Sequence, residues 1–230
     1  MFSGLMIISM VMSVVGMLVS NRLQSKFQYY SQIGLGNRMS GKEIAEAMLR
    51  HYGIVDVKVQ MAQGFLTDHY NPADKTVNLS ETVYNGRSVS SAAVAAHECG
   101  HAVQHATAYS MLQLRSAIVP AVKVASGLQQ ILLMAGVVLL STSFGKPLLL
   151  VTIAIFAVTA LFSLITLPVE FDASRRALAW LESSGTTRGQ EHDGAKDALW
   201  WAAMTYVAAA LAALASLLYL VMRYMNMNRQ

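Results

Sequence analysis

The stretch LLLVTIAIFAVTALFSLITL, residues 148–167, contains no charged residue and decides the fold class. A transmembrane helix needs about 20 predominantly apolar residues, which is the length of this stretch. Residues 2–19, 124–140 and 202–222 are similarly apolar, and each is predicted to span a membrane. The chain is therefore predicted to be a mainly α-helical membrane protein with four transmembrane helices.

The composition supports this interpretation. Of the 230 residues, 54% are hydrophobic and 13% are charged, and the mean hydropathy is +0.42. These values are typical of a membrane protein with one modest water-facing part. The net charge of +4 is spread along the chain rather than clustered, so no nucleic-acid partner is expected. The lipid bilayer is the expected partner, and the oligomeric state is not indicated.

The positions of lysine and arginine predict the orientation in the bilayer. Residues 22–123 contain ten basic residues and residues 168–201 contain four. The other side receives Lys146, Arg223 and Arg229. Because basic loops stay in the cytoplasm, both water-facing segments are predicted to be cytoplasmic and both termini to lie outside. The first span lacks a preceding basic residue and a clear small-residue cleavage site, which favours an uncleaved anchor.

The water-facing part is predicted to be a small α+β domain. MSGKEIAEAMLRHYG, residues 39–53, begins with a capping box and predicts a helix. VDVKVQ, residues 55–60, alternates apolar and polar residues as a strand does. NPADKTVNLSETVY, residues 71–84, predicts a turn and a short strand around 76–79. TVNLS is either an exposed edge that binds extended substrate or an ordinary paired strand.

Composition predicts the structure of two further segments of the water-facing part. SVSSAAVAAHECGHAVQHATAY, residues 88–109, is alanine-rich, lacks proline and predicts a long helix. Residues 183–195 are polar and contain three glycines, which indicates a mobile loop.

The long helix carries HECGH, an HExxH motif formed by His97, Glu98 and His101. Residues four apart share one helix face about 6 Å apart, so both imidazoles can bind one zinc ion. Glu98 lies beside the first ligand and is placed to take a proton from a zinc-bound water. The alternative is a helix face with two packed histidines, which an otherwise apolar helix makes less favourable.

Two other residues near the motif are not expected to bind zinc. His105 lies about 12 Å along the helix from His97, and no glycine breaks the helix between them. It is expected at the surface or behind a ligand. Cys99, the single cysteine, points about 200° away from His97 on a helix and is expected to be a small packed residue.

A catalytic zinc site needs a third protein ligand. The candidates are Asp68 and His69 before the motif, and Glu170 and Asp172 after it. Glu170 is favoured because it follows the third span on the same side as the domain. A new helix is expected to begin there, after Pro168. The alternative role for Glu170 is an interfacial charge or a helix cap.

Five blocks together, AAHECGHAVQ, LTDHYNP, VNLSETVY, TLPVEFDASRRAL and AMTYVAAAL, resemble the YugP-like family of neutral zinc metallopeptidases, over nearly the whole chain. The resemblance implies a bacterial, membrane-embedded endopeptidase of the gluzincin type with a zincin-like domain, one Zn²⁺ per chain and protein or peptide substrates. The family is distantly similar to HtpX-type membrane proteases, in which a membrane hairpin separates HExxH from the glutamate ligand.

The resemblance also implies residue roles. His97, His101 and Glu170 match the metal ligands and Glu98 matches the general base. The HtpX-type pattern has an aspartate four residues after the ligand glutamate, where this chain has a serine. Asp172 is expected to orient a histidine instead.

The chain is predicted to lie in the bacterial plasma membrane and to divide into five segments. These are an anchor at 1–20, a cytoplasmic metallopeptidase domain at 21–120, a transmembrane hairpin at 121–167, a cytoplasmic segment with the third ligand at 168–201, and a transmembrane helix at 202–222.

Peptide hydrolysis at this site would need a second donor to the oxyanion besides zinc. Its candidates, left open, are Tyr206, His69, His192, Arg175 and Arg176.

Two non-enzymatic alternatives are a membrane scaffold or regulator that keeps a structural zinc site, and a zinc transporter. A structural site requires four protein ligands, and the sequence offers no obvious fourth. A transporter requires ligands inside the spans, which are almost devoid of them.

Overall fold

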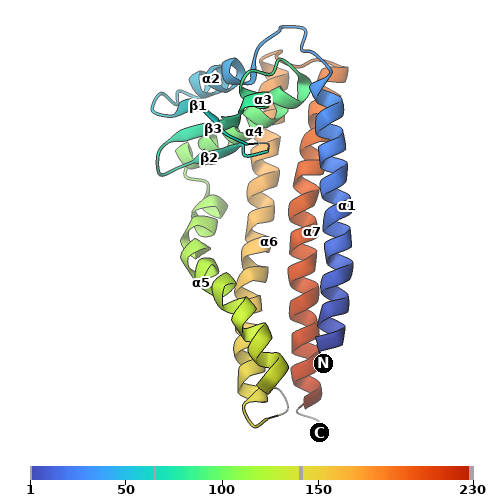
Figure 1. Cartoon of the computed structure of the whole chain (residues 1–230). Coiled ribbons are helices and arrows are strands. Elements are labelled where there is room, and N and C mark those ends of the chain that lie inside the picture. The colour runs from blue at the N-terminus through green and yellow to red at the C-terminus, as the bar shows by residue number, and fades with distance from the viewer. Residues whose placement is uncertain (1, 65, 140–141, 228–230) are drawn as a thin grey trace. The chain divides into compact units, whose positions relative to one another are not determined.

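The computed structural model describes residues 2–64, 66–139 and 142–227. Leu140, the predicted end of the second span, and Arg229 of the charge count lie outside these ranges. Figure 1 traces the elements in chain order: α1 (Phe2–Ser31), α2 (Gly41–His51), β1 (Lys58–Ala62), β2 (His69–Asn71), β3 (Thr76–Ser80), α3 (Glu81–Tyr84), α4 (Val89–Ala106), α5 (Ser110–Leu139), α6 (Gly145–Ser183) and α7 (Gln190–Met227).

The chain divides into two compact units. Unit 1 comprises Met1–Val19, Leu114–Leu167 and Thr205–Gln230, and unit 2 comprises Ser20–Gln113 and Pro168–Met204. Helices α1, α5, α6 and α7 contribute residues to both units because each continues across a unit boundary.

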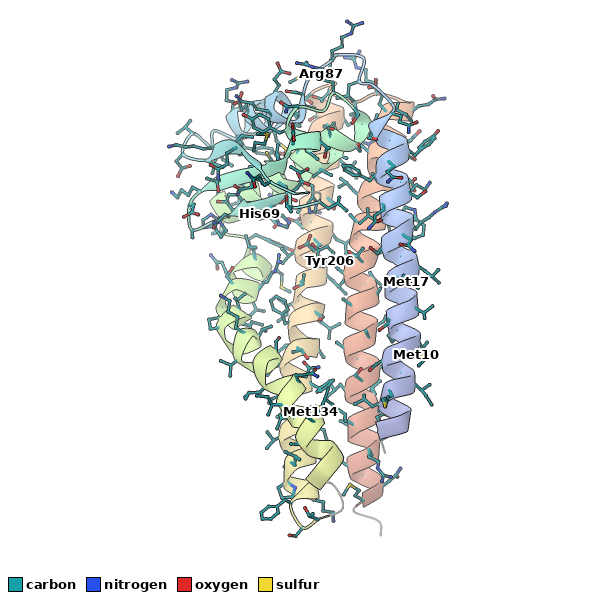
Figure 2. The ribbon with its side chains drawn as sticks, viewed as in Figure 1. Met10, Met17, His69, Arg87, Met134 and Tyr206 are labelled. Atoms are coloured by element: carbon teal, nitrogen blue, oxygen red, sulfur yellow. The ribbon has the colours of Figure 1, made fainter. Side chains whose placement is uncertain are left out.

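Unit 1 contains long apolar helical segments. The four predicted apolar segments are confirmed as parts of helices that are long and apolar enough to cross a membrane. A small core forms around Leu149, Phe156 and Leu220, but most large side chains face outward. Met10 is 67% exposed, and Figure 2 shows Met10 and Met17 projecting from α1. Such an extensive exposed apolar surface requires cover by lipid or protein.

The prediction that a helix begins after Pro168 is wrong, because α6 runs through this proline without ending. Proline removes one backbone donor and is tolerated inside a helix when the surroundings hold the flanking turns. Here Val169, Ala173 and Ala177 follow on one face and are fully buried in unit 2. Packing of this face therefore keeps the helix continuous.

The loop predicted at 183–195 is shorter than expected. Helix α6 ends at Ser183 and α7 begins at Gln190, so residues 190–195 are helical. The connection is held by specific contacts: the Glu191 carboxylate accepts a hydrogen bond from the Gly36 N–H at 2.8 Å. Thr187 is buried, and its hydroxyl lies 3.2 Å from His192 Nδ1. These contacts give the polar segment a defined path.

Unit 2 confirms the predicted α+β elements. Ser40 and Glu43 form the expected capping box at the start of α2. The sheet order is β1-β3-β2, with β1 parallel and β2 antiparallel to β3. TVNLS is therefore the central strand, so of the two alternatives the ordinary paired strand is confirmed and the exposed edge is wrong. Its five residues are all buried, and the antiparallel edge strand is β2.

Helix α4 forms the centre of unit 2. Its N-cap Ser88 accepts a hydrogen bond from the Ser91 N–H, as the serine-rich start of the segment predicts. Alanines 92, 93, 95 and 96 are fully buried, so the small residues of this helix face protein on several sides. Because alanine adds little bulk, neighbouring elements approach the α4 backbone closely.

Candidate metal centre

The two histidines of HExxH lie one helical turn apart on α4. Their ring centroids are 4.8 Å apart, and the ring planes are nearly perpendicular. Both side chains are 12% exposed, which leaves access to the rings from one side. The helical period of 3.6 residues produces this pairing from the sequence spacing alone.

Helix α6 brings Glu170 to the two histidines. The close approach of α4 and α6 depends on Gly100, the fourth residue of the motif. A Cβ atom added at Gly100 would lie 2.5 Å from the carbonyl oxygen of Ala173. Glycine therefore allows α6 to pass close enough for the buried Glu170 carboxylate, which is 2% exposed, to reach the histidines.

The three side chains converge with a geometry that suits zinc. Glu170 Oε2 lies 3.3 Å from His97 Nε2 and 3.5 Å from His101 Nε2. The three ligand atoms all lie within 4.8 Å of one another. Two ligands of a tetrahedral zinc ion, at bond lengths near 2.1 Å, are about 3.4 Å apart. The donor set therefore fits a zinc ion that leaves one position open.

The electrostatics of His101 reflect its buried carboxylate neighbours. Burial works against the charged ring, but the hydrogen bond with Glu170 and the charges of Glu98 and Glu170 outweigh it, so the pKa of His101 is raised. A metal cation that binds His101 competes with the proton for a ring nitrogen.

A second layer of polar side chains contacts the far nitrogen of each histidine. Ser174 Oγ lies 3.1 Å from His97 Nδ1, and Gln104 Oε1 lies 3.0 Å from His101 Nδ1. Ser174, four residues after Glu170, thus contacts a candidate ligand. Asp172, which is expected to orient a histidine, contacts Gln104. Gln104 was missed by the sequence reasoning, although it lies three residues after His101 on the same helix.

Glu98 is held by the edge strand. Its side chain is 8% exposed, and Oε2 accepts a hydrogen bond from the Tyr70 N–H at 3.0 Å. Because this N–H points toward Glu98 rather than toward β3, the outer edge of β2 faces the HExxH helix. Sequence patterns do not predict this contact, because it joins a backbone N–H to a side chain 28 positions away.

The other candidate ligands make different contacts. Asp68 accepts hydrogen bonds from the Ser80 N–H and hydroxyl, and burial raises the pKa of its carboxyl. His69 Nδ1 lies 2.8 Å from the Thr67 carbonyl oxygen. Among the described residues, neither joins the cluster of His97, His101 and Glu170.

The remaining motif residues behave as expected. His105 is exposed, and its Nδ1 lies 2.8 Å from the hydroxyl of Tyr70. Cys99 is fully buried, and its thiol contacts the Ala45 carbonyl oxygen of α2 at 3.6 Å. Burial raises the pKa of this thiol, which keeps it protonated.

Three of the candidate oxyanion donors in unit 2 contact other side chains. Arg175 and Arg176 pair with the Asp172 carboxylate, and His192 contacts Thr187. Tyr206 belongs to unit 1 and is partly exposed. Figure 2 labels Tyr206 on α7 and His69 on the sheet.

Comparison with known proteins agrees with these features. Residues 5–225 match the family described as "Putative neutral zinc metallopeptidase". The chain is 44% identical to a Bacillus subtilis (strain 168) protein named "Putative membrane protease YugP". The 206 aligned residues cover 89% of each of the two chains. No solved structure matches. The family match spans nearly the whole sequence, including the candidate ligands His97, His101 and Glu170, and the chain therefore belongs to this neutral zinc metallopeptidase family.

Proposed function

We propose that this chain is a membrane-embedded zinc endopeptidase of the gluzincin type, with His97, His101 and Glu170 as ligands and Glu98 as general base. The observation that carries the proposal is the convergence of three ligand atoms within 4.8 Å beside a glutamate held by a backbone N–H. A closed structural site would need a fourth protein ligand. Among the described residues, the cluster contains three.

The chain's residues have distinct roles in this proposal. A bound zinc ion supplies a Lewis acid that polarises a carbonyl and lowers the pKa of water. The Glu98 carboxylate accepts the proton of the attacking water and later passes it to the leaving amine. The Tyr70 N–H holds one oxygen of this carboxylate, which directs the other toward the reacting water.

The edge strand supports a mode of substrate binding. Strand β2 pairs with β3 on one side, while its Tyr70 N–H points to Glu98 on the other. An extended peptide added along this outer edge would place its backbone beside the general base. The four apolar helices favour membrane proteins or their membrane-proximal segments as substrates.

The charge distribution supports a proposal for where the site lies in the cell. We propose that residues 21–120 and 168–201 form one zincin-like domain in the cytoplasm, and that residues 1–20, 121–167 and 202–222 anchor it in the bacterial plasma membrane. The excess of lysine and arginine in the two water-facing segments supports this orientation.

The proposal is tested with purified full-length protein in detergent, by measuring zinc content together with cleavage of casein and self-cleavage. Wild-type protein is expected to contain about one zinc ion and to cleave. Glu98→Gln should keep the zinc and lose roughly 100-fold or more of the activity. Glu182→Gln, an exposed change on α6, is the matched control and should behave like wild type.

Two results would contradict the proposal. If Glu98→Gln cleaves as fast as wild type, Glu98 is not the general base. If wild-type protein binds zinc but cleaves neither casein nor itself, a regulatory or scaffolding role with a structural zinc site replaces the peptidase assignment.

A further inference from the structure

Gln104 is a fully buried polar side chain whose three contacts connect both ligand-bearing helices. Its Nε2 donates to the Val169 carbonyl oxygen at 2.8 Å and to Asp172 Oδ2 at 2.9 Å, both on α6. Its Oε1 lies 3.0 Å from His101 Nδ1 on its own helix, α4. An uncharged amide thus sits between a carboxylate and a candidate metal ligand.

These partners fix which way the amide points. A carbonyl oxygen and an ionised carboxylate can only accept hydrogen bonds, so both must face the NH₂ group of Gln104. A flipped amide would direct its oxygen at two other oxygens and leave buried acceptors without donors, which is unfavourable. The orientation of the amide therefore follows from the hydrogen-bonding chemistry of its partners.

The fixed amide determines the tautomer of His101. Because Gln104 presents an oxygen, His101 Nδ1 must carry the hydrogen that this oxygen accepts. The lone pair of the neutral ring then lies on Nε2, the atom that faces Glu170 at 3.5 Å. Only this tautomer offers a metal-binding electron pair toward the cluster.

Asp172 acts one step further away. It is 5% exposed and pairs with Arg175 and Arg176 while accepting from Gln104. The two arginines keep it an acceptor, and Asp172 in turn holds the amide in the required orientation. The bond from Gln104 to Val169, the residue before Glu170, also ties the third ligand's helical turn to α4.

We infer that Gln104 is a positioning residue that fixes the Nδ1–H tautomer of His101, and that Asp172 acts on His101 through Gln104. The inference rests on the zinc site of the proposed function. It concerns affinity for the metal, so it is separable from peptide cleavage.

The test is the zinc affinity of full-length protein in detergent, measured by competition with a chelator. Gln104→Met removes all three contacts at similar volume and should weaken zinc binding by roughly 10- to 100-fold, as loss of outer contacts to metal ligands does. Gln104→Glu keeps an acceptor for His101 but cannot donate to Asp172, and should weaken binding similarly. Gln32→Met, at an exposed glutamine, should leave the affinity unchanged.

A second substitution separates positioning from mere packing. Asp172→Asn supplies an N–H that can donate to the new carboxylate, so its addition to Gln104→Glu should restore most of the lost affinity. Added to Gln104→Met, the same change should have no further effect, because the connection is already cut. Size-exclusion profiles of the purified variants report whether each is folded.

Several outcomes overturn the inference. Zinc affinity equal to wild type in every variant shows that Gln104 does not position His101. A Gln104→Glu protein that stays zinc-free or misfolded after Asp172→Asn is added contradicts the connection, as does an equal loss from Asp172→Asn in both backgrounds. Wild-type protein that binds zinc without cleaving peptides contradicts only the peptidase proposal, whereas wild-type protein without zinc affinity contradicts both.

Discussion

Helices α4 and α5 are both apolar, yet they meet different surroundings. In α4, small residues predominate, and Ala92, Ala93, Ala95 and Ala96 are fully enclosed by protein. In α5, only 6% of the most apolar window is buried, and large side chains such as Ile131 and Met134 are more than 60% exposed. Hydropathy alone does not distinguish these helices. Residue size does distinguish them. The small residues of α4 allow neighbouring backbones to approach closely, whereas the large exposed apolar residues of α5 need an apolar solvent.

The largest effect on zinc binding is expected when a buried polar residue that α6 contributes beside α4 is replaced. Glu170→Ala removes one of three candidate ligands, and the zinc content is expected to fall from about one ion per chain to nearly none. Glu182→Ala, on the exposed part of the same helix, is the control and should keep its zinc. Elemental analysis of the purified proteins decides this. Equal zinc in both variants would remove Glu170 from the site.

The exposed surface of α5 is tested by adding a charge. Ile131→Arg places a cation on a residue that is 62% exposed, and membrane insertion of this helix should cost about 3–4 kcal/mol more. Val55→Arg, at a residue of unit 2 that is 90% exposed, should change stability by no more than about 0.5 kcal/mol. Yields of membrane-inserted protein measure the difference. Similar losses in both variants would mean that the two exposed surfaces face the same solvent.

Glycine substitutions probe the same contrast inside the helices. Gly100→Ala puts a methyl group 2.5 Å from the Ala173 carbonyl oxygen and is expected to destabilise the protein by about 1–3 kcal/mol and to weaken zinc binding. Gly127→Ala in α5 meets nothing within 4 Å and should be neutral or stabilise by up to about 1 kcal/mol. Thermal unfolding in detergent compares them. The close approach of α4 and α6 is refuted if Gly100→Ala is the more stable variant.

The smallest effect is expected at Cys99. Its thiol is buried, and burial raises its pKa, so maleimide labelling should be slow in native protein and fast in denaturing detergent. Cys99→Ala should keep full zinc content because the thiol contacts α2 rather than the cluster. Loss of zinc in this variant would make Cys99 a ligand.

Local patterns in the sequence were sufficient for much of this architecture. The capping box at Ser40, the strand at 76–79 and the pairing of His97 with His101 follow from periods of a few residues. Glu170 required more: the preceding span was expected to return the chain to the side of the motif, and the family resemblance favoured Glu170 over the other candidates.

Features that depend on tertiary contacts could not be predicted in this way. Pro168 lies within a continuous helix because the following turns are buried, and TVNLS is central because β2 returns along it. Ser174 reaches His97 only once α4 and α6 have packed, and Gln104, although it shares α4 with His101, is oriented by its contacts with α6.

The most direct test of the central claim is X-ray absorption spectroscopy at the zinc edge of the purified wild-type protein. A site formed by His97, His101 and Glu170 predicts nitrogen and oxygen neighbours at about 2.0–2.2 Å, with imidazole scattering from two histidines and no sulfur. A zinc–sulfur distance near 2.3 Å, or a shell without two imidazoles, would contradict this site.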